Sequence, residues 1–156
     1  NENSTVIEKA LNEKGEGEAE FILVVTNPAY SGLKKRNYDG EEKTKKIKVK
    51  TARLDEEINE KIKIDLIKID VEGGEMGVLR GSEKILKKWK PVLIFEHGLG
   101  ASDKYGTLPE DLFDYLIQFN YQISTMKNYL DKKTSFSKSD FADQFYQSKN
   151  YYFIAW

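Results

Sequence analysis

Residues 64–75 constrain the fold of this chain more than any other stretch. A short run rich in isoleucine and leucine ends at Asp70, and the pair Gly73 and Gly74 follows, which is typical of a buried strand that enters a tight turn. A helix is expected after the turn. In an open parallel α/β sheet, ligands bind beyond the carboxyl ends of the strands. The stretch therefore predicts an α/β fold with an acidic site at that edge, formed by Asp70, Glu72 and Glu75.

Composition limits the classes of protein to which the chain can belong. Its 156 residues fit one domain, and 39% of them are hydrophobic, which is enough for a core. The net charge of −1 gives no electrostatic reason to expect nucleic acid or a membrane surface as a partner. The absence of cysteine excludes disulfides and thiolate metal sites. No apolar run approaches the about 20 residues of a membrane span and no secretory signal is visible, so we expect a cytoplasmic location.

Residues 1–60 are expected to hold N-terminal strands and a basic loop. Apolar runs predict strands at residues 5–11 and 21–25, and lysines alternate with apolar residues over residues 46–51. We interpret that lysine face as a solvated strand face that discourages edge pairing. Asn27-Pro28-Ala29-Tyr30 is similar to the Asn-Pro-Pro-Tyr motif of amino-methyltransferases, but Asp70 takes the place at the strand end where that motif belongs, so we prefer a simple turn.

Residues 61–156 are expected to form the core of the same domain. Helices are predicted over residues 54–58 and 75–80, and a further one up to Trp89 has Ser82 as its cap. Pro91 begins the next strand, which ends at Glu96 and His97. Residues 107–110 show a capping-box pattern for another helix, and residues 121–126 and 151–156 predict the last two strands. Residues 127–149 give no clear pattern.

Three motifs in order resemble the C-terminal half of the FkbM family. They are Lys68-Ile-Asp-Val-Glu-Gly-Gly-Glu75, Val78-Leu-Arg-Gly-Ser-Glu83 and Pro91-Val-Leu-Ile-Phe-Glu-His97. The resemblance implies an S-adenosylmethionine-dependent methyltransferase with a Rossmann-like class I sheet. It also implies O-methylation of a sugar or another small hydroxylated metabolite, so that the partner is a small-molecule or glycan acceptor. The implied cofactor-binding residues are Asp70, Val71 and Ala10.

One departure from the family pattern carries further expectations. Family members begin with a strand, a glycine-rich cofactor turn and a second strand that ends in an acid, and no such turn precedes the first strand here. We therefore expect a methyltransferase domain that lacks its first two strands and is inactive by itself. The strand before Asp70 would then expose an edge, covered either by the N-terminal strands or by a second copy in a homodimer.

Methyl transfer to a hydroxyl group needs alignment of the two reactants and an acceptor for the hydroxyl proton. The candidate catalytic residues are Asp70, Glu72, Glu96 and His97, with Asp70 or His97 as the base and Glu72 orienting the substrate or cofactor. Asp70 and Glu72 could instead cap the following helix, and Glu75 is interpreted as a first-turn acid.

Two other functions stay open from the residues alone. The acids could bind Mg²⁺ or Ca²⁺, as in a metal-dependent hydrolase, although nothing in the sequence requires a metal and we expect none. The chain could also be a non-catalytic interaction or oligomerisation fragment of a methyltransferase domain.

Overall fold

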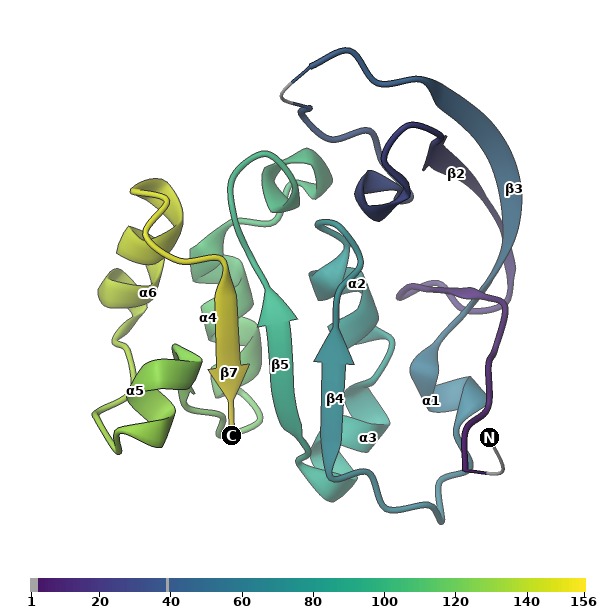
Figure 1. Ribbon diagram of the computed structural model, residues 1–156. Helices are drawn as coiled ribbons and strands as arrows, with labels where there is room; N and C mark the ends of the chain where they lie inside the picture. Colours follow the sequence, from purple (N-terminus) through teal and green to yellow (C-terminus); the bar gives the residue numbers. More distant parts are fainter. Residues whose placement is uncertain (1–2, 39) are drawn as a thin grey trace.

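The computed structural model describes residues 3–38 and 40–156, and it has a mixed α/β architecture (Figure 1). Residues 1–2 and 39, which belong to the predicted N-terminal strands and basic loop, lie outside the described residues. One sheet has the order β1-β3-β2 and is built from β1 (Ala10–Leu11), β2 (Gly17–Val24) and β3 (Thr44–Ala52). The other has the order β4-β5-β7-β6 and is built from β4 (Leu66–Ile69), β5 (Val92–Glu96), β6 (Ile123–Ser124) and β7 (Tyr152–Ala155). The expected α/β class is confirmed.

The four-stranded sheet places the predicted acidic site. β4 and β5 are parallel, with Ile69 opposite Phe95, so that Asp70 and Glu96 lie together beyond the carboxyl ends of these strands. β7 runs antiparallel to both β5 and β6, so the two predicted last strands form an antiparallel pair at one edge of the sheet.

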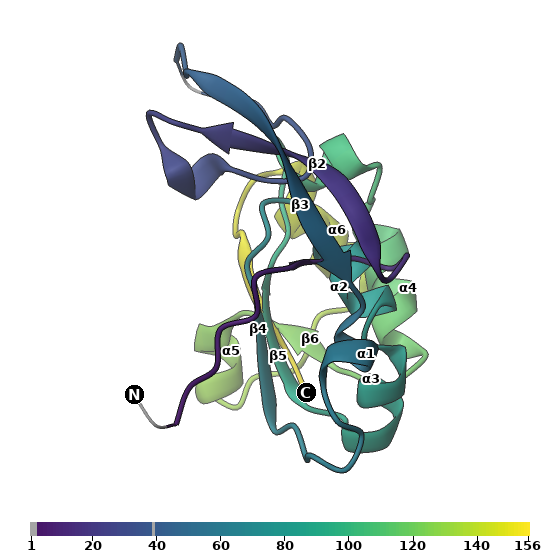
Figure 2. The same cartoon turned by 90° about the vertical axis from the view of Figure 1, so that its right-hand side faces the viewer.

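Helices cover one face of the four-stranded sheet, as Figure 2 shows for α2 (Glu75–Arg80), α3 (Glu83–Trp89) and α4 (Pro109–Ile117). The unassigned stretch after residue 126 forms α5 (Met126–Leu130) and α6 (Lys138–Tyr146). The core between helices and sheet includes Ile69, Leu79, Leu86, Leu93, Phe95, Leu112, Leu116 and Phe141. None of the helices in the described chain is both long enough and apolar enough to span a bilayer.

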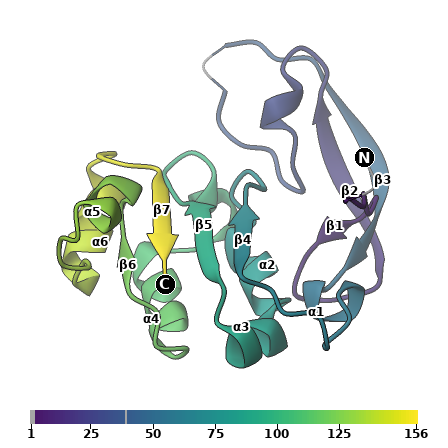
Figure 3. The same ribbon diagram turned by 60° about the horizontal axis from the view of Figure 1, so that its bottom comes forward.

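The N-terminal strands differ from expectation. Residues 5–9 form no strand, and β1 pairs in parallel with β3, whereas β2 and β3 form a long antiparallel hairpin. Figures 1 and 3 show this sheet beside the four-stranded one, nearest to β4. Of the two coverings expected for the free edge of β4, pairing with the N-terminal strands does not occur among the described residues, because the backbone groups of these strands pair with one another. The central strand is also less buried than predicted, since Leu66 is 55% exposed.

The N-termini of two helices differ from the sequence prediction. Ser82 precedes α3, but its hydroxyl donates to the Val78 carbonyl. The cap comes from Asp55 of α1 (Leu54–Glu57), whose carboxylate accepts from the backbone N–H groups of Lys84 and Ile85. The predicted capping box at residues 107–110 is absent, because α4 starts one residue later, with Leu108 as its N-cap and Pro109 in its first turn.

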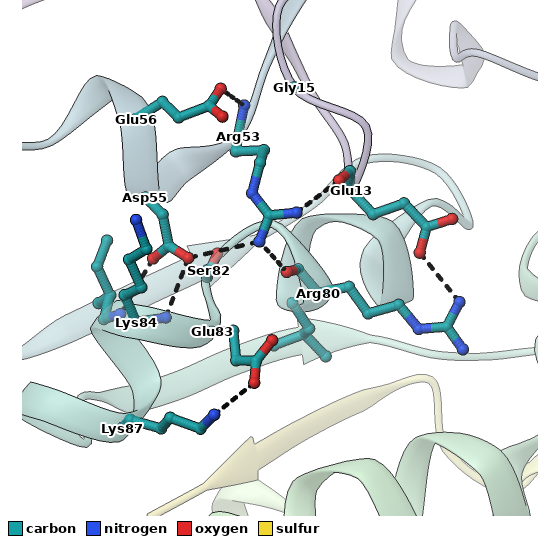
Figure 4. Close-up of polar contacts among 12 residues, drawn as sticks. Glu13, Gly15, Arg53, Asp55, Glu56, Arg80, Ser82, Glu83, Lys84 and Lys87 are labelled. Carbon is teal, nitrogen blue, oxygen red and sulfur yellow. Dashed lines mark hydrogen bonds and ion pairs between the residues drawn. The ribbon is translucent and has the colours of Figure 1, made fainter.

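Arg53, directly after β3, joins the N-terminal sheet to α2 beside this cap (Figure 4). Its guanidinium donates to the carbonyl of Glu13, after β1, at 2.6 Å and to the carbonyl of Arg80, at the end of α2, at 2.9 Å. The same group lies 3.6 Å from the Asp55 carboxylate. The hairpin is thereby held against the helices that support the turn after β4.

Candidate functional site

The turn after β4 has a backbone that only glycine fits at its centre. Glu72 and Gly73 both have positive φ angles, 54° and 103°. A Cβ atom on Gly73 would lie 2.5 Å from the Ala101 backbone, so a side chain would push this loop and the turn apart. The Glu75 carboxylate Oε1 accepts from the N–H of Gly73 at 3.0 Å, which supports the predicted structural role for Glu75 in the first turn of α2.

Three predicted catalytic acids meet in one cavity. The carboxylates of Asp70, Glu72 and Glu96 each place one oxygen within 4.8 Å of the others. They line a cavity of about 450 Å³, to which His97 and Glu75 also contribute. The parallel register of β4 and β5 brings these groups together from segments more than 20 residues apart in the sequence.

Arg36, in the segment between η1 (Pro28–Tyr30) and β3, lines this cavity. Its guanidinium forms an ion pair with the Glu72 carboxylate and lies 4.8 Å from the Tyr30 ring centre. The backbone N–H of the next residue, Asn37, donates a hydrogen bond of 3.2 Å to the Gly100 carbonyl, in the loop after β5. Sequence reasoning missed Arg36, because it stands in a basic stretch of which only the lysine face at residues 46–51 was interpreted, as a solvated strand face. Tyr30 and Tyr38 flank Arg36 in the sequence, and their stacked rings have centres 6.2 Å apart. These two aromatic residues were the local sequence feature that could have indicated an ordered Arg36.

His97 lies in the wall of the cavity and is 1% exposed. Its imidazole stacks on Phe145 and Phe141 of α6. Burial lowers the pKa of His97 to about 4, so the ring is neutral at pH 7. Its Nε2 has no hydrogen-bond partner within the described part of the chain. The neutral imidazole therefore has Nε2 available for a hydrogen bond with a group that reaches the cavity wall.

The remaining acids are held by different partners. Asp70 forms an ion pair with Lys68, two residues earlier on the same face of β4. Glu96 accepts a hydrogen bond from the Tyr152 hydroxyl, and this contact raises the pKa of Tyr152. Burial raises the pKa of the Glu75 carboxyl. The side chain of Asp70 is 40% exposed, so its carboxylate is the one most accessible to a ligand from solvent.

The three predicted cofactor-binding residues lie around a second cavity, of about 290 Å³. Asp70, Val71 and Ala10 all line it, together with apolar groups of Leu11 and Phe21. Asp70 also lines the first cavity, and it is the only predicted site residue that faces both.

The strand order β4-β5-β7-β6, with acids beyond the parallel pair, is compatible with the α/β methyltransferases. The family profile described as the methyltransferase FkbM domain matches residues 2–123 of this chain. Because the match covers most of the chain, the protein belongs to the FkbM methyltransferase family, which does not favour a purely non-catalytic role. No curated protein and no solved structure matches the chain.

Proposed function

We propose that this protein is an S-adenosylmethionine-dependent O-methyltransferase with a Rossmann-like sheet, and that it acts on a hydroxyl of a sugar or another small hydroxylated metabolite. The observation that carries the proposal is the position of Asp70 between two cavities. A methyltransferase must hold donor and acceptor side by side in a near-attack arrangement. The smaller cavity suits the donor and the larger one the acceptor.

The residues around the smaller cavity fit part of the proposed cofactor. Ala10, Leu11, Phe21 and Val71 offer apolar surface for a flat adenine ring, and Asp70 offers a negative charge beside it. A volume of about 290 Å³ is at the low end of ligand sites, which measure about 300–1,000 Å³, so the cavity encloses only part of such a molecule. S-adenosylmethionine supplies an electrophilic methyl group on a positively charged sulfur.

The larger cavity has groups that suit a hydroxylated acceptor. Tyr30, Tyr151 and Tyr152 present flat apolar surface for the C–H face of a sugar ring, and the carboxylates can accept hydrogen bonds from its hydroxyls. In the proposed mechanism Asp70 accepts the proton of the attacking hydroxyl, since its carboxylate is exposed between the cavities. His97 is the second candidate base, and Glu72, fixed by Arg36, orients the acceptor.

The proposal is tested by ligand binding and by methyl transfer. In saturation-transfer NMR we expect S-adenosylmethionine to bind the wild-type chain, and methyl transfer by this chain would overturn the expectation that it is inactive by itself. With labelled S-adenosylmethionine and a panel of monosaccharides, Asp70→Asn should lower methyl incorporation by about 10²-fold or more. The matched control is Asp65→Asn, at the opposite end of β4, where the side chain is 75% exposed. Equal transfer by both variants would remove Asp70 from the mechanism, and no binding by the wild type would overturn the proposed function.

A further inference from the structure

We propose that the carboxylates of Asp70, Glu72 and Glu96 form a binding site for one divalent cation that prefers oxygen ligands, of the class of Mg²⁺, Mn²⁺ or Ca²⁺. Their ligand oxygens lie within 4.8 Å of one another. Oxygens on opposite sides of a bound cation are separated by about 4.0–4.2 Å for Mg²⁺ and about 4.6–5.2 Å for Ca²⁺. One ion can therefore contact all three acids after at most a small side-chain adjustment.

The surrounding cavity can complete the coordination of such an ion. Its volume of about 450 Å³ leaves room for water molecules beside three carboxylates. Hard cations usually keep several water ligands when the protein supplies only a few oxygens. The three acids come from the end of β4, the following turn and the end of β5, so the position of the site is fixed by the sheet.

Two buried groups provide a second, independent indication of a ligand in this cavity. Glu75 and His97 both line it and are each 1% exposed, yet Glu75 Oε2 and His97 Nε2 have no hydrogen-bond partner among the described residues. Buried polar atoms are normally satisfied by protein or by ordered water. Waters around a bound cation would supply donors to both atoms, and the cation would offset the negative charge of the acids.

The present counter-charges leave part of the acidic cluster unbalanced. Arg36 is paired with Glu72 and Lys68 with Asp70, whereas Glu96 has no cationic partner in the part of the chain that the structure describes. Arg36 is paired with the Glu72 carboxylate, which is also a proposed ligand of the cation. It therefore competes with the cation, and its removal should strengthen binding.

Titration of the full chain with Mn²⁺, followed by the electron paramagnetic resonance of the free ion, tests this inference. We expect one bound Mn²⁺ per chain, displaced by excess Mg²⁺ or Ca²⁺. Glu96→Gln and Asp70→Asn should each weaken binding at least tenfold, and Arg36→Met should strengthen it severalfold. Asp65→Asn is the control with unchanged affinity, because that exposed aspartate lies at the far end of β4.

Circular dichroism checks that each variant is folded. If Asp70→Asn does not fold, the Mn²⁺ affinity of Glu96→Gln tests the site. A wild-type chain that binds no Mn²⁺, or a folded Glu96→Gln variant with wild-type affinity, would overturn the inference. The titration contains neither cofactor nor acceptor, so its result is independent of the proposed methyl transfer. Binding of Mn²⁺ without binding of S-adenosylmethionine would reject the proposed function and leave the cation site standing.

Discussion

His97 follows β5, and α6 encloses its imidazole with two aromatic rings, whose centres lie 4.7 Å (Phe145) and 5.8 Å (Phe141) from it. Burial lowers its pKa from 6.5 to about 4. Between these values the unfolded chain binds a proton that the folded chain does not bind. The free energy of unfolding must therefore fall as the pH drops from about 6.5 to about 4, by up to about 3 kcal/mol from this residue.

The variant His97→Phe should remove this dependence, since phenylalanine fits among the aromatic rings and does not titrate. Urea unfolding of both proteins at pH 7 and pH 4.5 measures it. We expect the wild type to lose about 2–3 kcal/mol more than the variant over this interval. Glu75 has a raised pKa and acts with the opposite sign, but it is present in both proteins and cancels in the comparison. Parallel pH profiles would show that His97 can be protonated in the folded state.

Among the secondary-structure elements, α1 has only four residues, but it caps the N-terminus of α3. The side chain of its Asp55 is 1% exposed, and the two carboxylate oxygens accept from the N–H groups of Lys84 and Ile85 at 3.0 Å each. These N–H groups belong to the first turn of α3 and would otherwise be unpaired. Arg53 completes the junction by binding the end of α2.

Asp55→Ala should lower the free energy of unfolding by about 1–2 kcal/mol, because it removes the cap and leaves the N–H groups of Lys84 and Ile85 without their carboxylate partner. Chemical denaturation followed by circular dichroism measures the change. Asp131→Ala is the matched control: Asp131 forms an exposed ion pair with Lys127, and such pairs contribute about 0.2–1 kcal/mol. If both substitutions cost the same, Asp55 does not hold the junction.

The same element shows what could be predicted from the sequence. A first-turn acid at position 55 was predictable from the local pattern, as was the strand-turn-helix at residues 66–80. That Asp55 caps α3 in place of Ser82 was not, because the partner lies about 30 residues away and the choice depends on packing. Arg36 was missed for the same reason, since its role exists only where the loop meets the turn after β4.

For the whole molecule, the arrangement of the two sheets leaves β4 at an edge. In the described chain β4 pairs with β5 alone, and Leu66 next to this edge is 55% exposed. The N-terminal strands form their hydrogen bonds within their own sheet and so do not pair with this edge. An unpaired edge with an exposed apolar side chain is a template for another strand. Pairing with a second copy, the other expected covering, stays a prediction.

We therefore expect two chains to pair through their β4 edges in a symmetric dimer. β4 has only four residues, so few hydrogen bonds can form and the dimer should be weak and dependent on concentration. Sedimentation velocity over a range of concentrations measures the association. Leu66→Lys should shift the chain to monomer, because a charge beside each edge repels its counterpart across the twofold axis. Leu130→Lys replaces a leucine of α5 that is 69% exposed and should leave the association unchanged. A wild type that stays monomeric at every concentration, or an equal effect of both substitutions, would show that β4 is not the contact.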